Sequence, residues 1–441
     1  MLNLPHEEKM DILLITSFYP YIYGDASFIE SEMPFLSKHF NKVHVLFTEN
    51  NAVKYEKLGV PENIIVIPTA SDTGKKNKRY RELKSLFILP FHLFRIIGIL
   101  FKELWVLLIR KKIYVETIKT ACNFLLDANL SAVFISKYLQ QNPEINIVYT
   151  YWFERKTMAS LLCKKYLNKN IKCITRTHGY DLYEFRLKNN YQPYKKWMDQ
   201  HIDRIFFASL NGYNYYNNIF ASSNKNKYIV SKLGIKNEYS LQDIYNKGDM
   251  NGCLKIISCS YMVPVKRIHL IIETLSRITD IKINWVHIGD GIERNNLESM
   301  AENLLKNNVN ITYKFLGFFD NASVKKYYYN NCFDCFISTT ETEGGNPVSM
   351  MEAISFGIPV IATNVGGVPE IVNNETGILL DPDNCVEELE NALRRFASMA
   401  VSEKEALRKS CRKYWENNYR AETQYTQFVK HIIDLCNYQK E

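Results

Sequence analysis

Two successive series of short apolar segments, each about as long as a β-strand, limit what this chain can fold into. The first series lies at 11–18, 42–47, 64–68, 145–152, 171–179 and 203–209. The second lies at 254–260, 283–289, 311–317, 334–339 and 359–363. Stretches with helical periodicity, such as 27–40 and 347–356, separate the segments. This alternation predicts two α/β, Rossmann-like domains, each with a doubly wound parallel sheet.

A polar stretch without apolar periodicity, at 236–252, is interpreted as the linker between the two series. The predicted N-terminal domain is 1–240 and the predicted C-terminal domain is 250–415. Residues 416–441 are expected to form a helix that packs back on the N-terminal domain. Because ligands of open parallel sheets bind outside the carboxyl ends of the strands, two such domains facing each other are expected to share a cleft.

The distribution of charge and the number of cysteines limit the partners, the metal sites and the compartment that can be expected. The net charge of +8 is uneven, because residues 1–245 hold 34 basic and 22 acidic side chains, which suggests an anionic partner for the first half. The basic cluster at 75–84 is short and belongs to no compact nucleic-acid-binding motif. Nucleic acid is therefore not expected as a partner. The ten cysteines are scattered, and the single CxxC at Cys332 and Cys335 lacks a second ligand pair for zinc. Without a signal-peptide pattern at the N-terminus, a cytoplasmic protein is expected.

The segment 86–109 is strongly apolar and about as long as a membrane span. It also contains Arg95, Lys102 and Glu103, whose charges make spanning costly. Basic residues flank it within 75–112, six before it and three after it. Such flanks around an amphipathic helix are typical of a segment lying on an anionic membrane surface. A core helix with solvated charged ends is the alternative.

The most informative stretch, 338–372, contains a glycine-rich loop between two acids. A Gly-Gly-Asn-Pro loop opens an expected helix, and Pro347 suits the first helical turn. Glycine amides at a helix N-terminus form a ready anion site. Glu343 precedes this helix and Glu352 lies inside it. Since carboxylates accept hydrogen bonds from ribose and sugar hydroxyls, this combination predicts a nucleotide-sugar site.

With these residues, the chain resembles the retaining GT-B glycosyltransferases of family four, most strongly at 254–372. Such enzymes move a sugar from a nucleotide-sugar donor to an acceptor. The resemblance implies that Glu343 binds hydroxyls of the donor sugar and Glu352 the ribose. The family motif E-G-x-P-x-x-x-x-E has seven residues between its glutamates. Here eight residues separate them, which puts one extra residue in the loop 344–346.

The family also holds the donor diphosphate with an Arg and a Lys near the start of the second domain. Lys266 matches the Lys, Ser260 stands where the Arg is usual, and Arg267 or another cation is expected to compensate. The first βα loop of the chain and a GxG turn near the base complete the expected donor site. The implied donor-binding residues are Gly24, Asp25, Ser260, Lys266, Arg267, Gly289, Gly344, Gly345, Asn346, Pro347, Val348 and Glu352.

The stretch 176–184 resembles the family's His-Gly element, which implies that His178 lies near the transferred sugar and its phosphate. His178, Glu343 and Lys266 form the implied catalytic set. The candidates for acceptor contacts are Asp181, Tyr183, Glu184 and Arg186, for which loop surface or local ion pairing is an equally open interpretation. No metal site and no cofactor are expected.

These observations predict a retaining, metal-independent glycosyltransferase that uses a nucleotide-sugar donor and a glycan acceptor, expected to be lipid-linked. Surface polysaccharide, capsule or lipopolysaccharide assembly is the expected setting, and the protein is expected to be peripheral at the inner face of the cytoplasmic membrane. Two alternatives remain. One is a nucleotide-sugar 2-epimerase, which the two glutamates and Lys266 disfavour. The other is a catalytically silent, membrane-associated assembly partner.

Overall fold

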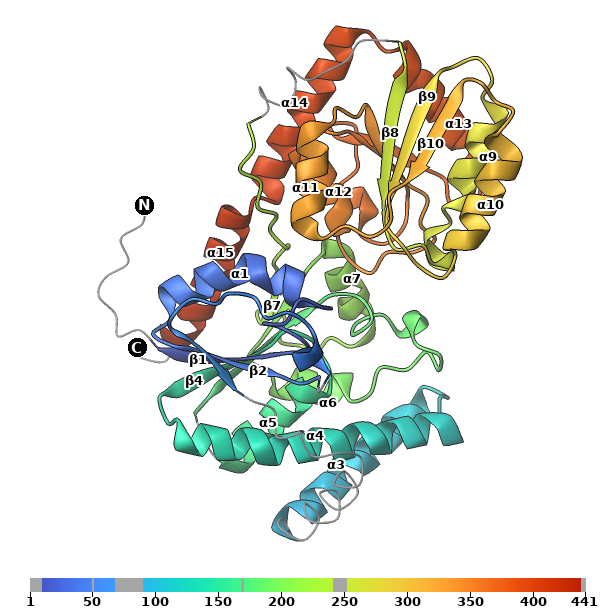
Figure 1. The fold of residues 1–441 in the computed structure, drawn as a ribbon. Helices are drawn as coiled ribbons and strands as arrows, with labels where there is room; N and C mark the ends of the chain where they lie inside the picture. The colour runs from blue at the N-terminus through green and yellow to red at the C-terminus, as the bar shows by residue number, and fades with distance from the viewer. Residues whose placement is uncertain (1–9, 50, 68–89, 168–169, 241–251, 438–441) are drawn as a thin grey trace. The chain divides into compact units, whose positions relative to one another are not determined.

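The protein consists of two compact units, one of residues 1–231 with 425–441 and one of residues 232–424. The computed structural model describes residues 10–49, 51–67, 90–167, 170–240 and 252–437. The predicted basic cluster at 75–84 lies outside this range. Each unit is built on one parallel sheet covered by helices, so the predicted fold class is confirmed (Figure 1).

The first unit contains a seven-stranded sheet in the order β3-β2-β1-β4-β5-β6-β7. Its strands are β1 (Asp11–Thr16), β2 (Val43–Phe47), β3 (Ile64–Ile67), β4 (Ile145–Thr150), β5 (Lys172–Thr177), β6 (Arg204–Phe207) and β7 (Tyr228–Val230). Its helices are α1 (Ala26–His39), α3 (Pro90–Ile109), α4 (Val115–Gln141), α5 (Arg155–Leu167), α6 (Lys195–His201), α7 (Leu210–Ile219) and most of α15 (Ala421–Asn437).

Strand β1 shows why these strands are continuous apolar runs in the sequence. Leu13 and Ile15 belong to the core on one face of the sheet, whereas Ile12 and Leu14 belong to the core on the other. Successive residues of a strand point to opposite faces, so a sheet covered on both sides needs apolar residues at every position. Polar residues are therefore displaced to the two ends of the strands and to the loops.

The second unit contains a six-stranded sheet in the order β10-β9-β8-β11-β12-β13. Its strands are β8 (Leu254–Cys259), β9 (Ile283–Ile288), β10 (Ile311–Phe315), β11 (Cys335–Ser338), β12 (Val360–Thr363) and β13 (Gly377–Leu380). Its helices are α9 (His269–Arg277), α10 (Arg294–Leu305), α11 (Asn321–Asn330), α12 (Val348–Ser355), α13 (Cys385–Ser398) and α14 (Val401–Asn418). Short 3₁₀ turns at Pro264–Lys266 and Val368–Glu370 follow β8 and β12.

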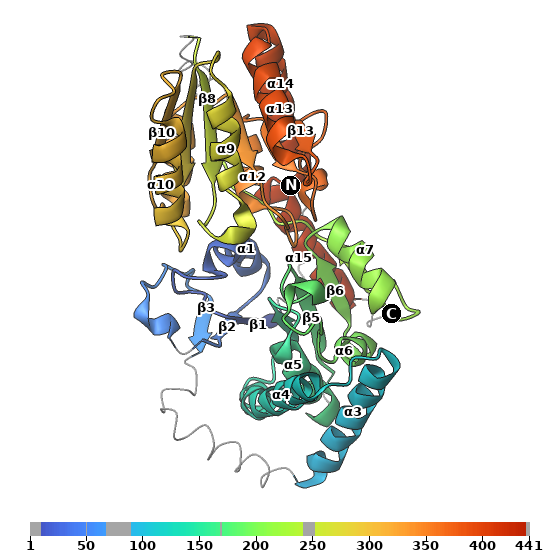
Figure 2. The ribbon, with the colours of Figure 1, turned by 90° about the vertical axis from the view of Figure 1, so that its right-hand side faces the viewer.

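Helices α3 and α4 lie side by side on the first unit, as Figures 1 and 2 show. Within the described residues, α4 is the one helix long and apolar enough to cross a membrane by length and composition, and 39% of its apolar window is buried. Its residues Ala121, Leu125 and Ala128 belong to the same core on one face of the sheet as Leu13 and Ile15. Helix α4 therefore contributes to the packing of this unit.

Candidate functional site

In the first unit, the loop after β1 is folded around the carboxylate of Asp25. This carboxylate accepts hydrogen bonds from the backbone N–H groups of Ser17 (2.7 Å) and Phe18 (2.9 Å) and from the indole N–H of Trp152 (3.1 Å). Burial raises the pKa of Asp25, and these hydrogen bonds oppose the rise. Asp25 thus holds the loop that contains Gly24 in one shape. Its carboxylate oxygens are already occupied by these hydrogen bonds.

His178 follows β5 at the carboxyl end of the same sheet. Its ring stacks on Tyr151, with ring centroids 4.6 Å apart, and lies 4.7 Å from the ring of Trp152. Burial, with a smaller contribution from the positive charge of Arg176, lowers the pKa of His178 to about 3. The imidazole is therefore neutral at physiological pH, which suits a hydrogen-bonding role rather than that of a charged acid.

Asp181, an acceptor candidate, ties the loop after β5 to its neighbours. Its carboxylate accepts hydrogen bonds from the backbone N–H groups of Phe153 (2.9 Å), His178 (2.9 Å) and Gly179 (3.0 Å). The buried ammonium of Lys195 donates to the backbone carbonyl of Asp181 at 2.5 Å. These bonds fix the position of His178. The contacts of Asp181 therefore match local bonding within the first unit, which was the alternative to a role in acceptor contacts.

The other acceptor candidates have similar local partners. Glu184 forms a two-point ion pair with Arg110 (2.8 and 2.6 Å) and a third contact with Lys112 (2.9 Å). Arg110 and Lys112 belong to the basic flank after α3, and both are partly exposed beside Glu184, so their contact with an anionic surface stays a prediction. The hydroxyl of Tyr183 donates to Asn211 at 2.6 Å. Arg186 is exposed at the end of a short 3₁₀ turn.

In the second unit, Lys266 and Glu343 form an ion pair between two loops. Lys266 ends the 3₁₀ turn after β8, and Glu343 lies in the loop between β11 and α12. Both side chains are partly exposed, at 24% and 14%. The structure therefore brings together two of the three residues predicted to be catalytic, and it leaves both within reach of solvent.

Arg267 was expected to replace the charge that Ser260 lacks. Its guanidinium instead donates to the backbone carbonyls of Thr339 (2.9 Å) and Pro382 (3.2 Å). These bonds attach the 3₁₀ turn to the ends of β11 and β13, so the side chain supports the position of Lys266. The guanidinium of Arg267 is thus bonded to backbone carbonyls, and its compensation for Ser260 stays a prediction.

The predicted donor residues Ser260 and Gly289 lie against each other. The backbone N–H of Ser260 donates to the carbonyl of Ile288 at 3.0 Å, and the N–H of Gly289 donates to Gly317 at 2.9 Å. A Cβ atom built on Gly289 would lie 1.8 Å from the carbonyl oxygen of Ser260. Only glycine fits this close approach of the turns after β8 and β9.

The glycine-rich loop before α12 packs on a second glycine turn, at Gly366 and Gly367. A Cβ atom on Gly366 would lie 1.9 Å from the carbonyl oxygen of Glu343, and one on Gly367 would lie 2.6 Å from that of Gly345. This support of one glycine turn by another was not predicted from the sequence. The repeated pair of adjacent glycines after two neighbouring strands was the available signal.

The loop Gly344–Asn346 also folds inward at its last residue. Asn346 is buried, at 7% exposure, and its side-chain amide donates to the hydroxyl of Tyr419 at 3.4 Å. Tyr419 in turn donates to the backbone carbonyl of Glu370 at 2.6 Å. Pro347 then precedes α12 and Val348 begins it. The longer loop is thus accommodated by packing its asparagine into the unit.

Glu352 lies inside α12 and is separate from the Lys266–Glu343 pair in its contacts. Its side chain is buried, at 4% exposure, and accepts a hydrogen bond from the amide of Asn321. Burial raises its pKa, with the charge of Lys325 and the hydrogen bond from Asn321 acting in the opposite direction. Asn321 was not anticipated, because a single asparagine at the start of α11 carries no pattern.

Comparisons with known proteins bear on this second unit first. The family model described as glycosyl transferases group 1 matches residues 249–418, which include the 3₁₀ turn of Lys266 and the loop of Glu343. The match therefore covers the stretch 254–372, at which the sequence resemblance is strongest.

Several curated proteins are similar to the chain. An uncharacterized glycosyltransferase of Methanocaldococcus jannaschii is 27% identical over 257 residues, 58% of this chain and 66% of that protein. A putative colanic acid biosynthesis glycosyltransferase of Escherichia coli is 26% identical over 171 residues, 38% of this chain and 41% of that protein. The aligned regions thus cover less than two thirds of the length of these relatives.

Solved structures are similar over nearly the whole chain. A glycosyltransferase from Rickettsia africae has a TM-score of 0.66 at 17% identity, covering 98% of this chain and 99% of that one. An Anabaena protein crystallised with UDP and glucose has a TM-score of 0.61 at 15% identity, covering 96% and 99%. At these identities the likeness shows the fold alone. The chain therefore has the GT-B fold, and its second unit matches the model of the glycosyl transferases group 1 family.

Proposed function

We propose that this protein is a retaining glycosyltransferase that moves a sugar from a nucleotide-sugar donor to a glycan acceptor. The ion pair of Lys266 and Glu343 beside the glycine loop of α12 carries the proposal. A cation at this position would neutralise the charge that develops on the leaving diphosphate. The carboxylate would accept hydrogen bonds from hydroxyls of the transferred sugar. The match of residues 249–418 to the glycosyl transferases group 1 model supports this assignment.

The proposed mechanism assigns each group one task. The amides of Gly344 and Gly345, with the N-terminus of α12, hold the diphosphate together with Lys266. No side chain of this set is placed as a covalent nucleophile, so the acceptor hydroxyl attacks on the face from which the diphosphate departs, and its proton passes to the diphosphate. His178 serves as a neutral hydrogen-bonding partner of the sugar. No metal is required for these steps.

The first test is incubation of the protein with a panel of nucleotide sugars and glycan acceptors. The proposal requires release of nucleoside diphosphate coupled to glycosylation of an acceptor. Conversion of the donor sugar to its 2-epimer without transfer would identify an epimerase. Donor binding or membrane binding without any turnover would identify the silent assembly partner, for which Ser260 in place of the usual Arg is the supporting observation.

Glu352→Gln is expected to weaken donor binding by about 10- to 100-fold while the fold survives. The substitution keeps an oxygen that can accept from Asn321, but it removes a charged acceptor for the ribose hydroxyls. A hydrogen bond to a charged group contributes about 1.5–3 kcal/mol. Calorimetric titration with the donor identified in the panel measures the change. Glu341→Gln, an exposed acid of the same loop, is the matched control, and equal affinities for both variants would contradict the assignment.

The acceptor is proposed to be a lipid-linked glycan of surface polysaccharide or lipopolysaccharide assembly. One relative is named for colanic acid biosynthesis, and a structural neighbour of 14% identity is a lipopolysaccharide outer core galactosyltransferase. A lipid-linked acceptor requires that the enzyme work at a membrane surface, and helix α3 has an appropriate face.

Helix α3 is apolar on both its buried and its exposed sides. Ile99 and Leu107 are buried in the core, and the carboxylate of Glu103 on the same side accepts hydrogen bonds from the hydroxyl of Tyr191 (2.7 Å) and the N–H of Tyr194 (2.9 Å). Apart from Gly98 and Lys102, the exposed residues described on this helix are large and apolar. They are Ile97, Phe101, Trp105, Leu108 and Ile109, exposed by 39%, 66%, 63%, 50% and 64%. An outward face that is apolar except for the exposed Lys102, with the one acid of the helix turned inward, matches an anionic bilayer interface better than water.

Replacing Phe101, Trp105 and Leu108 together by Ser is expected to lower binding to anionic vesicles at least tenfold. Each of these side chains contributes roughly 1.5–3 kcal/mol when fully buried in an apolar phase. Co-sedimentation with anionic and with neutral vesicles, at low and high salt, gives the measurement. The triple Ser variant of Ile292, Val309 and Phe318 in the second unit, exposed by 80%, 93% and 66%, is the control. Equal loss in both variants would show that α3 is not the membrane contact.

A further inference from the structure

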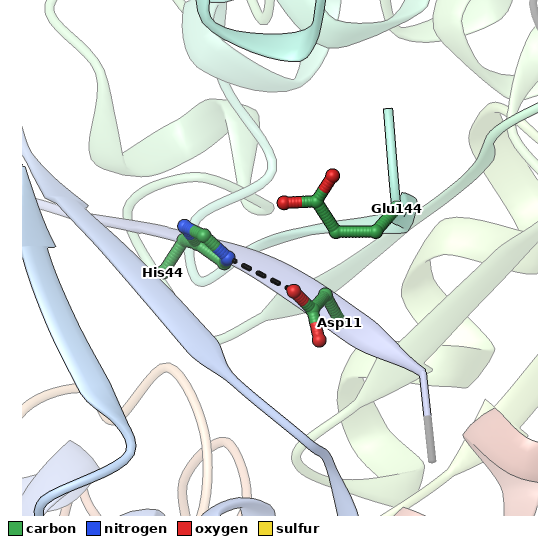
Figure 3. Close-up of side chains that lie close together, drawn as sticks. All are labelled: Asp11, His44 and Glu144. Atoms are coloured by element: carbon green, nitrogen blue, oxygen red, sulfur yellow. Dashed lines mark hydrogen bonds and ion pairs between the residues drawn. The ribbon is translucent and has the colours of Figure 1, made fainter. Parts of the chain in front are cut away.

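Three potential metal ligands converge at the amino end of the sheet of the first unit (Figure 3). Asp11 begins β1, His44 is the second residue of β2, and Glu144 lies in the turn before β4. These strands are neighbours in the sheet. One ligand atom from each of the three lies within 4.8 Å of the others. The cluster is at the opposite end of the strands from Asp25 and His178, so it belongs to neither proposed substrate site.

The two buried members of the cluster are already oriented. Asp11 and His44 are exposed by only 2% and 1%. One oxygen of Asp11, Oδ1, accepts from the amide of Asn41 (2.8 Å) and from the N–H of Lys42 (3.2 Å), while Oδ2 lies 3.3 Å from His44 Nε2. The other ring nitrogen of His44, Nδ1, is 2.7 Å from the hydroxyl of Tyr138. Outer partners of this kind fix the ring and the carboxylate of metal ligands.

The charge of the cluster also favours a cation. Two carboxylates share the site, and within the described residues neither has an ion pair with Lys or Arg. A divalent ion would neutralise this local excess of negative charge, whereas the hydrogen bond between His44 and Asp11 alone leaves Glu144 without a counter-charge.

We propose that Asp11, His44 and Glu144 bind a divalent transition-metal ion, with Zn²⁺ as the best match. One imidazole nitrogen and two carboxylate oxygens, completed by water, form an ordinary Zn²⁺ ligand set. With bonds of about 2.0–2.1 Å, ligand atoms of a tetrahedral site are roughly 3.3 Å apart. The 3.3 Å between Asp11 Oδ2 and His44 Nε2 has this value. Glu144 is exposed and therefore able to turn onto an ion that enters from solvent.

The bound ion would connect the starts of β1 and β2 to the turn before β4. Its role is thus structural, because it would link three neighbouring strands of the first unit and take no part in donor binding. An ion that binds the folded state alone stabilises that state by mass action. We therefore expect the melting temperature of the first unit to depend on the Zn²⁺ concentration.

The test uses the full-length protein without a polyhistidine tag, after removal of metals by a chelator. Titration of Zn²⁺ in competition with a chromophoric chelator should give one ion per chain, and the Co²⁺ form should show the visible absorption of a four-coordinate ion. Zn²⁺ at about 100 times its dissociation constant should raise the melting temperature by roughly 5 °C. Glu144→Gln, on the surface, should bind Zn²⁺ at least tenfold more weakly and lose this rise. His44→Gln should lose both as well.

Glu62→Gln is the matched control, since Pro61-Glu62 precedes β3 as Pro143-Glu144 precedes β4. This variant should bind Zn²⁺ like the unaltered protein. Absence of stoichiometric Zn²⁺ binding would overturn the proposal, and so would equal Zn²⁺ affinities for Glu144→Gln and Glu62→Gln. In either case Asp11, His44 and Tyr138 form only a buried hydrogen-bonded chain.

Discussion

Lys266→Ala should lower sugar transfer by two to three orders of magnitude and change the melting temperature by no more than about 2 °C. The ammonium of Lys266 pairs with Glu343 at a partly exposed position, and such pairs contribute only about 0–1 kcal/mol to folding. Removal of one group that stabilises developing negative charge typically costs about 10²–10³ in turnover. Steady-state transfer assays beside thermal melting separate the two effects.

Lys404→Ala is a close control for this experiment. Lys404 forms an ion pair with Asp334 in the same unit, with side-chain exposures of 25% and 19% against 24% and 14% for Lys266 and Glu343. Losing it should cost a similar small amount of stability and leave transfer unchanged. A loss of transfer in both variants, or in neither, would remove Lys266 from the diphosphate site.

The order of strands and helices was largely predictable because burial on both faces leaves a continuous apolar run in the sequence. The two strands that the pattern missed are β7 and β13, each at the end of its sheet. They have three and four residues, which is too short for a recognisable period. No element was named between 110 and 144, where α4 lies, although its buried residues recur at helical spacing.

Part of the candidate site was predictable as well, and for a different reason. Lys266 and Glu343 were both predicted to be site residues although they lie 77 positions apart in the sequence. The structure joins them in an ion pair. The contacts of Arg267 and Glu184 were not predictable, because a guanidinium or a carboxylate reveals its partner only when the loops are in place. Arg267 proved to be bonded to backbone carbonyls and Glu184 to Arg110.

Gly366→Ala should damage both stability and donor binding. Gly366 has a φ of 53°, and its Cβ position lies 1.9 Å from the carbonyl oxygen of Glu343. A left-handed alanine costs about 1–2 kcal/mol, and forced overpacking adds about 1–3 kcal/mol. The loop that contains Glu343 must move to relieve the contact, so its carboxylate and the adjacent amides lose their alignment. Donor affinity should fall by more than tenfold.

Gly252→Ala separates backbone strain from this contact. Gly252 has a φ of 67°, yet its Cβ position has no atom within 4 Å. Its alanine variant should therefore lose about 1–2 kcal/mol from the left-handed conformation alone and retain full donor affinity. Denaturant unfolding and calorimetric donor titration of the two variants give the comparison.

If Gly366→Ala loses no more stability than Gly252→Ala and binds donor normally, the second glycine turn does not support the loop of Glu343. A selective loss of donor affinity at Gly366 would instead show that the two glycine turns act together, because only there does the added methyl group press on the loop of Glu343.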